Sequence, residues 1–375
     1  MNRIYRPAAR HSRGFTMIEM LIATVIGVIV LSGLTAMYVV ASNKQRDFSK
    51  QAQQYENGRY GIEILAKDLQ LAGFYGYYSS YTTPTSLPDP CYADTDTATY
   101  LAALGNPVYG YNAADKDTRA TGFPVSCGTW LNDDNLQPGS DIIVLQRADT
   151  TDIRAAGTNT LAEDIYLHAN AFSGAIQIGD GNAPPTLLNV KGSTASPVRK
   201  LHVHVYFVAP CSIPADDNAT GLCTGNSDDD GRPIPTLKRL ELTSDGTTRT
   251  MRIVPIAEGV EYLRIDWGLD TGNPFRDATV NSSGQQINSA TRLPGDGTPD
   301  SYASNPATAA QFANAVAARI SMLVRNPEIS FHFTDKGQYT VGSLGTLGPF
   351  NDGYRRHAFA ADVRLTNLSG RRENP

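Results

Sequence analysis

The sequence lacks the residue patterns on which most enzymes depend. Its 375 residues contain no Gly-x-Ser-x-Gly nucleophile elbow and no Gly-x-x-x-x-Gly-Lys-Ser/Thr phosphate loop. No other catalytic constellation stands out along the chain. We therefore expect a protein that is not an enzyme and that holds no cofactor.

Cysteine is scarce. The four cysteines are Cys91, Cys127, Cys211 and Cys223; none belongs to a Cys-x-x-Cys pair, and their spacing differs from that of zinc fingers. In an exported domain they would instead form disulfides. Four cysteines allow three connectivities. We favour Cys91–Cys127 with Cys211–Cys223, because neighbours along the chain meet most easily.

Blocks of basic residues are absent beyond the amino terminus. The net charge is −5, and residues 1–14 hold four arginines and no acid, so removing their +4 leaves −9 for the remainder. Proteins that bind nucleic acid are usually basic. Nucleic acid is therefore not an expected partner.

Charge is also absent from residues 20–40, where 21 consecutive residues are uncharged and mostly apolar. A helix of that length spans the roughly 30 Å hydrocarbon core of a bilayer. The basic leader would stay in the cytoplasm and the larger remainder would be exported. Glu19 is the anomaly, because an acid in a bilayer segment costs about 2.5–3.5 kcal/mol.

Three interpretations compete for this amino terminus. A signal peptide has an apolar region of about 7–15 residues followed by a small-residue cleavage site; this run is longer and no such site follows it. A plain signal anchor fits the length but leaves Glu19 unexplained. In the third, the chain is cut after Gly14, which brings the new terminal amine of Phe15 close to Glu19.

The stretch Gly14-Phe15-Thr16-Met17-Ile18-Glu19 resembles the processing site of type IV prepilins. The resemblance implies that residues 1–14 are a leader peptide, that a prepilin peptidase cuts between Gly14 and Phe15, and that Phe15 is then N-methylated. It also implies that Glu19 pairs with the terminal amine of a neighbouring subunit and sets the register of assembly. A buried charge is tolerable when it is paired. Major pilins often carry a proline midway along the apolar helix, whereas residues 34–37 contain none.

Beyond the transmembrane, filament-core helix of residues 15–41, we expect an amphipathic helix over residues 42–73. The positions that repeat at alternating steps of four and three, one of them polar, are Phe48, Ala52, Tyr55, Arg59, Ile62, Ala66 and Leu69. Gly58 and Gly61 are expected to weaken this helix in its middle. Gly73 is expected to end it.

Residues 74–375 are predicted to form a β-rich head. Residues 74–140 look irregular, and residues 307–317 a short helix. Strands with one buried face are predicted from alternating or apolar runs at residues 142–146, 201–207, 237–242, 251–256, 262–267, 319–325 and 359–366. The fold class is therefore α+β: a long amino-terminal helix, transmembrane and then amphipathic, with a mostly antiparallel, pilin-like globular head.

The carboxy-terminal half resembles the PilW family of minor pilins, best over residues 259–367. The resemblance rests on residues 259–271, 295–302, 317–325 and 355–367, together with residues 65–74. It implies a minor pilin of the bacterial inner membrane, with a periplasmic head, that primes type IV pilus polymerisation and sits at or near the tip. The implied partners are other minor pilins, the major pilin, the inner-membrane assembly platform and a large tip adhesin, with roles in adhesion and twitching motility.

Two rival functions share part of this pattern. A minor pseudopilin of a type II secretion or DNA-uptake system would have the same amino terminus. An adhesive head on a pilin stalk would use residues 80–200, which match no family that we can name.

Several residues are weak candidates for binding. His202 and His204 lie on one face of a predicted strand and would ligate a metal only with a third residue. Asn226, Asp228 and Asp230 copy the first half of a calcium loop, but Leu237 stands where a bidentate glutamate is needed. The acidic turn of residues 296–300 would add carboxylates to the same ion.

Aromatic side chains gather just after the long helix. Tyr75, Tyr77, Tyr78 and Tyr81 are expected either to contact another subunit or to wedge the helix against the head. The sequence leaves both alternatives open.

Overall fold

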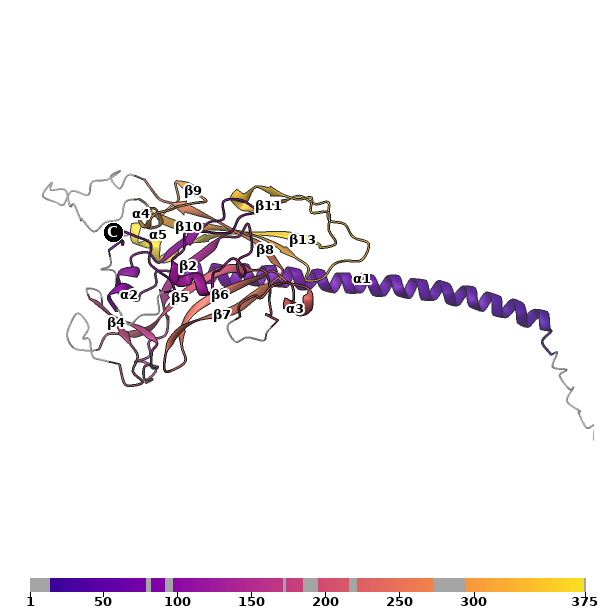
Figure 1. Cartoon of the computed structure of the whole chain (residues 1–375), viewed down its shortest axis with the longest axis horizontal. Helices are drawn as coiled ribbons and strands as arrows, with labels where there is room; N and C mark the ends of the chain where they lie inside the picture. The colour runs from indigo at the N-terminus through magenta and orange to yellow at the C-terminus, as the bar shows by residue number, and fades with distance from the viewer. Residues whose placement is uncertain are drawn as a thin grey trace, which may run out of the picture. The chain divides into compact units, whose positions relative to one another are not determined.

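The computed structural model describes residues 14–78, 82–91, 97–170, 173–184, 195–215, 221–272 and 295–373 (Figure 1). The chain divides into two compact units, Met1–Lys50 and Gln51–Pro375. Except for Gly14, the leader lies outside the described residues, and so does Tyr81.

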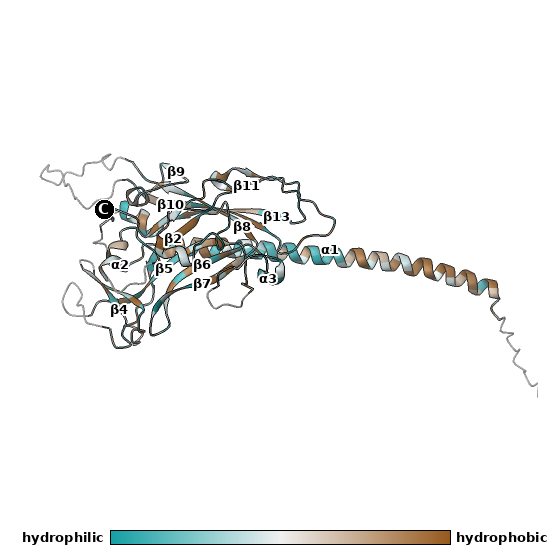
Figure 2. Ribbon diagram, viewed as in Figure 1, coloured by the Kyte–Doolittle hydropathy of each residue, from teal (hydrophilic) through white to brown (hydrophobic). Residues whose placement is uncertain are grey.

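Helix α1, Met17–Leu71, passes through both units. Its amino-terminal part is strongly apolar and its later part is more polar, which the change from brown to teal makes visible (Figure 2). The helix ends where Gly73 adopts a positive φ of 71°. Glycine reaches this conformation without strain. The predicted end at Gly73 is thus confirmed to within the last turn.

The head contains two main antiparallel sheets. The first has the order β1-β2-β5-β3-β4, with β6 also paired to β5 and β7 paired to β6. Its strands are β1 Val108–Tyr111, β2 Ile142–Ala148, β3 Ile165–Ala169, β4 Gly174–Ile178, β5 Val198–Ala209, β6 Thr236–Ser244 and β7 Arg249–Glu258.

The second sheet has the order β13-β10-β8-β9, and a small hairpin joins β11 to β12. Its strands are β8 Val260–Leu269, β9 Ser301–Ala303, β10 Ala315–Arg325 and β13 Arg356–Arg364, and the hairpin consists of β11 Tyr339–Thr340 and β12 Thr346–Leu347. The short helices are α2 Thr97–Ala103, α3 Asp228–Gly231, α4 Ala309–Phe312 and α5 Thr366–Glu373, with 3₁₀ turns at Val125–Thr129 and Gly342–Leu344. The predicted α+β class, a long helix with an antiparallel β head, is confirmed.

Each predicted strand is present, but the expectation of one buried face is wrong for the central strands. Both faces of β5, β8 and β10 are largely buried. Their alternating polar residues face buried polar partners rather than water; Arg264, for example, donates to Asp141 at 2.7 Å. Alternation reports residue type and not exposure, so it could not separate these two cases.

Two local predictions also need correction. The helix expected at residues 307–317 is only the four residues of α4, and β10 already begins at Ala315. A capping box between Thr308 and Gln311 starts α4. The stretch predicted to be irregular contains α2 and β1.

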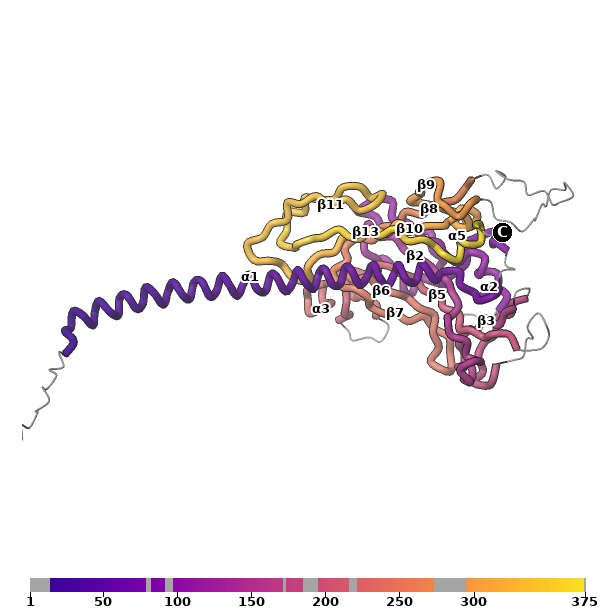
Figure 3. The backbone as a smooth tube through the Cα atoms, turned by 180° about the vertical axis from the view of Figure 1, so that it is seen from behind, coloured from indigo at the N-terminus to yellow at the C-terminus, as the bar shows by residue number. Residues whose placement is uncertain are grey.

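The buried face of α1 within the head differs from the predicted one. The positions that are buried are Gln54, Gly58, Gly61, Leu65, Asp68 and Leu69, and of the predicted stripe only Leu69 is among them. This part of α1 lies along one face of the head, in front of β5 and β6 when seen from behind (Figure 3).

The two glycines explain the difference. A Cβ atom at Gly58 would stand 2.3 Å from the ring of Phe359, and one at Gly61 would stand 3.1 Å from the Cβ of Ala257. Glycine lets two elements approach this closely. Gly58 and Gly61 are therefore contact points of α1 with the sheets, and α1 continues through both of them.

Replacing Gly61 with leucine should separate α1 from β7 and β10. We expect Gly61→Leu to lower the free energy of unfolding by about 1–3 kcal/mol, the usual cost of overpacking a tight core. Gln53→Leu is the matched control, because it adds the same side chain at an exposed position of the same helix. Thermal unfolding of both full-length variants in detergent would measure the effect, and equal melting temperatures would contradict this assignment.

Candidate functional site

The amino-terminal site is built around the first turn of α1. The hydroxyl of Thr16 accepts a hydrogen bond from the Glu19 amide at 3.2 Å, and Glu19 Oε2 accepts from the amide of Thr16 at 2.9 Å and from its hydroxyl at 3.0 Å. This reciprocal arrangement is a capping box, with Thr16 as the N-cap and Glu19 at the third helical position. Glu19 is thus held within its own chain at the start of the helix.

The apolar segment that follows offers its whole circumference to its surroundings. Every residue from 14 to 41 is exposed, and α1 is long and apolar enough to cross a membrane. The hydroxyls of Thr24, Ser32 and Thr35 each donate to a carbonyl oxygen three or four residues earlier. Internal bonds of this kind let hydroxyls lie in a lipid environment.

A second carboxylate of α1, Asp68, is buried where the helix meets the first sheet. It accepts hydrogen bonds from Arg147 Nε at 2.6 Å, His204 Nδ1 at 2.5 Å and the Tyr206 hydroxyl at 2.8 Å. Burial pushes the pKa of Asp68 up, but the hydrogen bond and charge of His204 and the charge of Arg147 outweigh it and hold the pKa below its ordinary range. Asp68 therefore fixes the end of α1 to β2 and β5.

His202 and His204, the weak metal candidates, belong to this same cluster, and neither is exposed. His202 contacts Asp149 at 3.2 Å, and His204 contacts Asp68. Burial lowers the pKa of His202 to about 4, and the charges of His204 and Arg147 add to this effect. Within the described part of the chain, neither histidine belongs to a group of three possible metal ligands.

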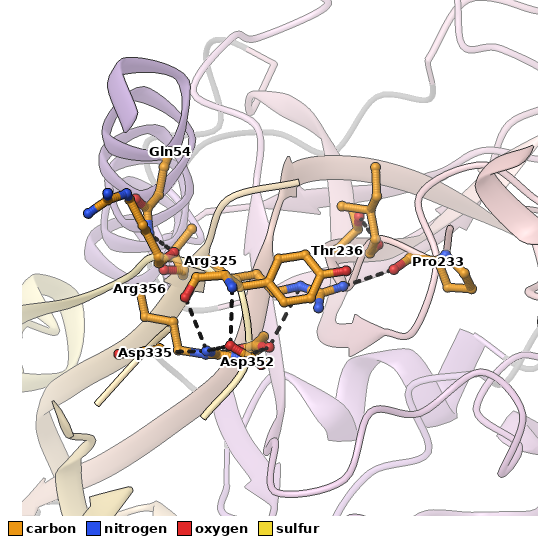
Figure 4. Close-up of polar contacts among 12 residues, drawn as sticks. Gln54, Pro233, Thr236, Arg325, Asp335, Asp352 and Arg356 are labelled. Carbon is orange, nitrogen blue, oxygen red and sulfur yellow. Dashed lines mark hydrogen bonds and ion pairs between the residues drawn. The ribbon is translucent and has the colours of Figure 1, made fainter. Parts of the chain in front are cut away.

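Further along α1, Gln54 ties the helix to the second sheet. Its amide nitrogen donates to the carbonyl oxygens of Val324 at 2.5 Å and Arg355 at 2.9 Å. Figure 4 shows this contact beside a cluster centred on Arg356, whose guanidinium contacts Asp335 and Asp352.

The Arg356 cluster secures the excursion between β10 and β13. The guanidinium also pairs with both oxygens of Glu261 on β8 and lies 3.8 Å from the ring centre of Phe350. Three carboxylates thus converge on one cation that is almost fully buried. Breaking such a buried network is costly, so this part of the head is firmly held.

A groove of about 610 Å³ lies between the outer flank of α1 and β13. Tyr55, Arg59 and Ile62 of α1 line one wall and Phe359 and Ala360 of β13 line the other. β13 is the end strand of its sheet. The helix positions that we expected in the buried stripe, Tyr55, Arg59 and Ile62, thus border this groove.

The cysteines are paired as their order in the chain favours. Cys91 is bonded to Cys127 and Cys211 to Cys223. The clusters of three potential ligands found in the described residues both consist of two of these bonded cysteines and one aspartate. They therefore offer no zinc site.

The residues proposed for calcium form a turn held by amides. Asp228 is buried and accepts from the amides of Thr224, Gly225 and Ala215. Asp230, the third candidate with Asn226, has a positive φ of 57°. Because backbone donors already occupy the Asp228 carboxylate, the described contacts account for this turn without an ion. In the other acidic turn, Asp296 accepts from Thr298 and Asp300 from Thr271.

The aromatic cluster divides between the two alternatives. Tyr75 and Tyr78 are buried and pack in the core with Leu65 and Leu69, which fits the wedge. Tyr77 is 74% exposed, so it does not wedge the helix against the head.

Two functional positions escaped the sequence reasoning. Thr16 completes a Thr-x-x-Glu pattern, which is the ordinary signature of a capping box, so the signal was present in the sequence. Asp68 carries no such local signal, because its three donors come from β2 and β5.

With this geometry in view, comparisons with known proteins are informative. A model of the prokaryotic N-terminal methylation motif matches residues 9–35, and the model described as Type IV Pilus-assembly protein W matches residues 223–367. The motif and the apolar α1 fit a pilin that is anchored in a membrane by its amino-terminal helix. Residues 223–367 thus carry the domain described as type IV pilus-assembly protein W.

Two other comparisons complete the picture. A type IV-like pilin from Thermus thermophilus is a structural neighbour, with 10% sequence identity and a TM-score of 0.30, over 84% of this chain and 96% of that one. No curated protein sequence matches the chain.

Replacing Asp68 with asparagine should loosen the end of α1. We expect Asp68→Asn to cost about 3–5 kcal/mol, because it removes the buried charge that the half-buried Arg147 pairs with. Asp362→Asn is the matched control: it breaks the exposed Arg319–Asp362 pair, which is worth at most about 1 kcal/mol. Denaturant unfolding of the full chain in detergent at neutral pH would measure both.

Lowering the pH should reproduce the loss of folding stability, because it protonates Asp68. Because the pKa of Asp68 is depressed in the folded state, its contribution is present above the ordinary aspartate pKa and disappears as the pH falls through the folded value. Stability of the wild type should therefore fall more steeply below about pH 4 than that of Asp68→Asn. Equal costs for the two variants at neutral pH, or parallel acid profiles, would contradict the role of Asp68.

Proposed function

We propose that this chain is a minor pilin that primes type IV pilus polymerisation at the bacterial inner membrane and ends at or near the pilus tip. The observation that carries the proposal is the contiguous Gly14-Phe15 cleavage pattern, followed at once by a capped helix that has Glu19 in its first turn and no other charge up to residue 40. The matched pilus-assembly domain supports a role in the pilus rather than in a secretion pseudopilus. The head then lies in the periplasm, where its two disulfides are stable.

The proposed mechanism begins with the stored subunit in the lipid bilayer. Before assembly, Thr16 occupies one oxygen of the Glu19 carboxylate, which reduces the cost of holding that charge in an apolar segment. Cleavage after Gly14 creates a positive amine at Phe15. In the filament, the amine of a neighbouring subunit pairs with Glu19, and this pairing sets the register.

The apolar helix has a reason to leave the lipid only for an equally apolar environment. Residues 14–41 are exposed on every side of the helix, so each side needs an apolar neighbour. A bundle of equally apolar pilin helices supplies such neighbours. The heads pack sideways against other minor pilins and the major pilin, and a large tip adhesin would lie above them. In this role the chain binds other pilins and positions them, and it catalyses no reaction.

The mature amino terminus is the first test. We expect the chain purified from cells to start at Phe15, with an N-methyl group, after loss of residues 1–14. Mass spectrometry of the intact protein and of its amino-terminal peptide measures both changes. A chain that still begins at Met1 would overturn the proposal, and one cut after residue 14 but unmethylated would contradict only the second processing step.

Variants of Glu19 and Thr16 separate capping from pairing. Glu19→Gln removes the charge but keeps a side chain that serves in a capping box, so we expect normal membrane insertion and at least about a tenfold fall in assembled pili, as the buried pair is lost. Glu19→Ala should show the same defect.

Thr16→Val is the complementary control, because it keeps the charge and removes the capping hydroxyl. Loss of an N-cap costs about 0.5–2 kcal/mol of helix stability, so pili should be nearly normal in number. Sheared pili would be quantified at equal membrane levels of each variant. Full piliation with Glu19→Gln, together with a defect in Thr16→Val, would assign Glu19 to capping instead.

A further inference from the structure

The two disulfides of the head lie beside opposite charges. The ammonium of Lys238 on β6 stands 3.6 Å from the sulfurs of both Cys211 and Cys223. Beside the other disulfide, a carboxylate oxygen of Asp89 stands 4.0 Å from the Cys127 sulfur and accepts the amide hydrogen of Cys91. The same kind of bond therefore has a cation next to it in one place and an anion in the other.

Lys238 is an unusual group to find in that position. It is only 1% exposed, its ammonium donates to the carbonyl oxygen of Gly221 at 2.9 Å, and it makes no ion pair within the described residues. Burial lowers the pKa of Lys238 to about 8, against the opposing charges of Asp229 and Asp228. A buried charge without a close counter-ion is costly, and a cysteine thiolate at either sulfur would supply one.

The acids near Lys238 have other partners. The Asp228 carboxylate lies within 4.8 Å of both cysteine sulfurs, but it already accepts from Thr224, Gly225 and Ala215. Asp229 accepts from the amides of Ser212, Ile213 and Ile234. Both carboxylates are thus occupied by amide donors, whereas the cation lies 3.6 Å from each sulfur.

We propose that Cys211–Cys223 is a thiol–disulfide exchange site of the head, at which a dithiol reacts in preference to Cys91–Cys127 because Lys238 receives the departing thiolate. The reductant is a dithiol, either a small molecule or a protein with a reduced cysteine pair. This role is separate from the assembly role of α1.

The exchange balances in two steps. A thiolate of the dithiol attacks the sulfur of Cys223, the less buried residue of the two, and the bonding electron pair leaves on the Cys211 sulfur next to Lys238. The second thiol of the dithiol then displaces the Cys223 sulfur, so the dithiol becomes a disulfide. Two electrons pass to the protein; each released cysteine takes a proton, or Cys211 remains a thiolate paired with Lys238.

Reduction would release a local fold rather than the whole head. The residues next to both cysteines supply amide donors to the Asp228 and Asp229 carboxylates. Ser212 and Ile213 do so just after Cys211, and Thr224 does so just after Cys223. The amide of Cys223 also donates to Asn135 at 3.2 Å. Opening the bond would therefore loosen the α3 turn against β6.

A graded reduction of the full-length wild type tests the proposal. The protein in detergent would be equilibrated at pH 7 with increasing dithiothreitol, quenched by alkylation and mapped by mass spectrometry. We expect Cys211–Cys223 to open at about tenfold less dithiothreitol than Cys91–Cys127, since a lysine beside a thiol can lower the thiol pKa by about two to three units, and the thiolate is then the main reduced form at pH 7. Opening of Cys91–Cys127 first, or of both bonds at one concentration, would overturn the proposal.

Charge variants show whether Lys238 causes the difference. Lys238→Met should remove most of the tenfold gap and Lys238→Arg should keep it. Asp89→Asn acts at the other disulfide, does not depend on the folding of the Lys238 variants, and should make Cys91–Cys127 easier to reduce. An unchanged gap in folded Lys238→Met would reject the mechanism; if that variant does not fold, an unchanged midpoint for Cys91–Cys127 in Asp89→Asn would reject it.

Discussion

A charge that leaves water must find a partner, and helix α1 carries one such charge near each of its ends. Asp68 is removed from water by the head and is satisfied completely within the chain, by donors from Arg147, His204 and Tyr206. Glu19 stands among apolar residues and is satisfied only in part, because the contacts described for its carboxylate all come from Thr16 and reach one oxygen. The first acid therefore explains how the helix is fixed to its own head. The second retains the capacity to accept a cation from elsewhere.

The contact between α1 and the head depends on small side chains as much as on charge. Gly58 and Gly61 let the helix approach Phe359 and Ala257 closely, and this closeness brings Gln54 and Asp68 within hydrogen-bonding distance of the strands on either side. Apolar side chains at the glycine positions would hold the helix away and leave those polar groups buried without partners, at a cost in free energy. The glycines and the buried polar groups on one face of α1 thus act together: the glycines allow the close approach, and the polar groups bond to the strands that it brings near.

The sequence was a good guide to the strands and to the amino terminus, and a poor guide to the face of α1. Runs such as residues 201–207 alternate because neighbouring side chains point to opposite sides of a sheet, a local property that the sequence records directly. The buried face of α1 instead contains a glutamine, two glycines and an aspartate, which no rule based on apolar periodicity would select. Their burial depends on β2, β5, β10 and β13, which follow much later in the chain. For the same reason Asp68 could not be found, whereas the Thr16 capping box could have been, since its two residues are three positions apart.

Buried polar residues of the central strands also find partners within the head. Strands β8 and β10 are buried on both faces, yet each alternates, since the polar half of each pattern enters ion pairs such as Arg264–Asp141 and the Arg356 cluster. Such pairs add little net stability compared with apolar packing, but removing one member is expensive. A head built in this way keeps one arrangement of its strands, so its outer surfaces keep one shape. The exposed helix of residues 14–41 has the opposite character, with one carboxylate and no fixed neighbour. The chain thus combines a head that forms its buried ion pairs internally with an amino-terminal helix whose one carboxylate is satisfied only in part.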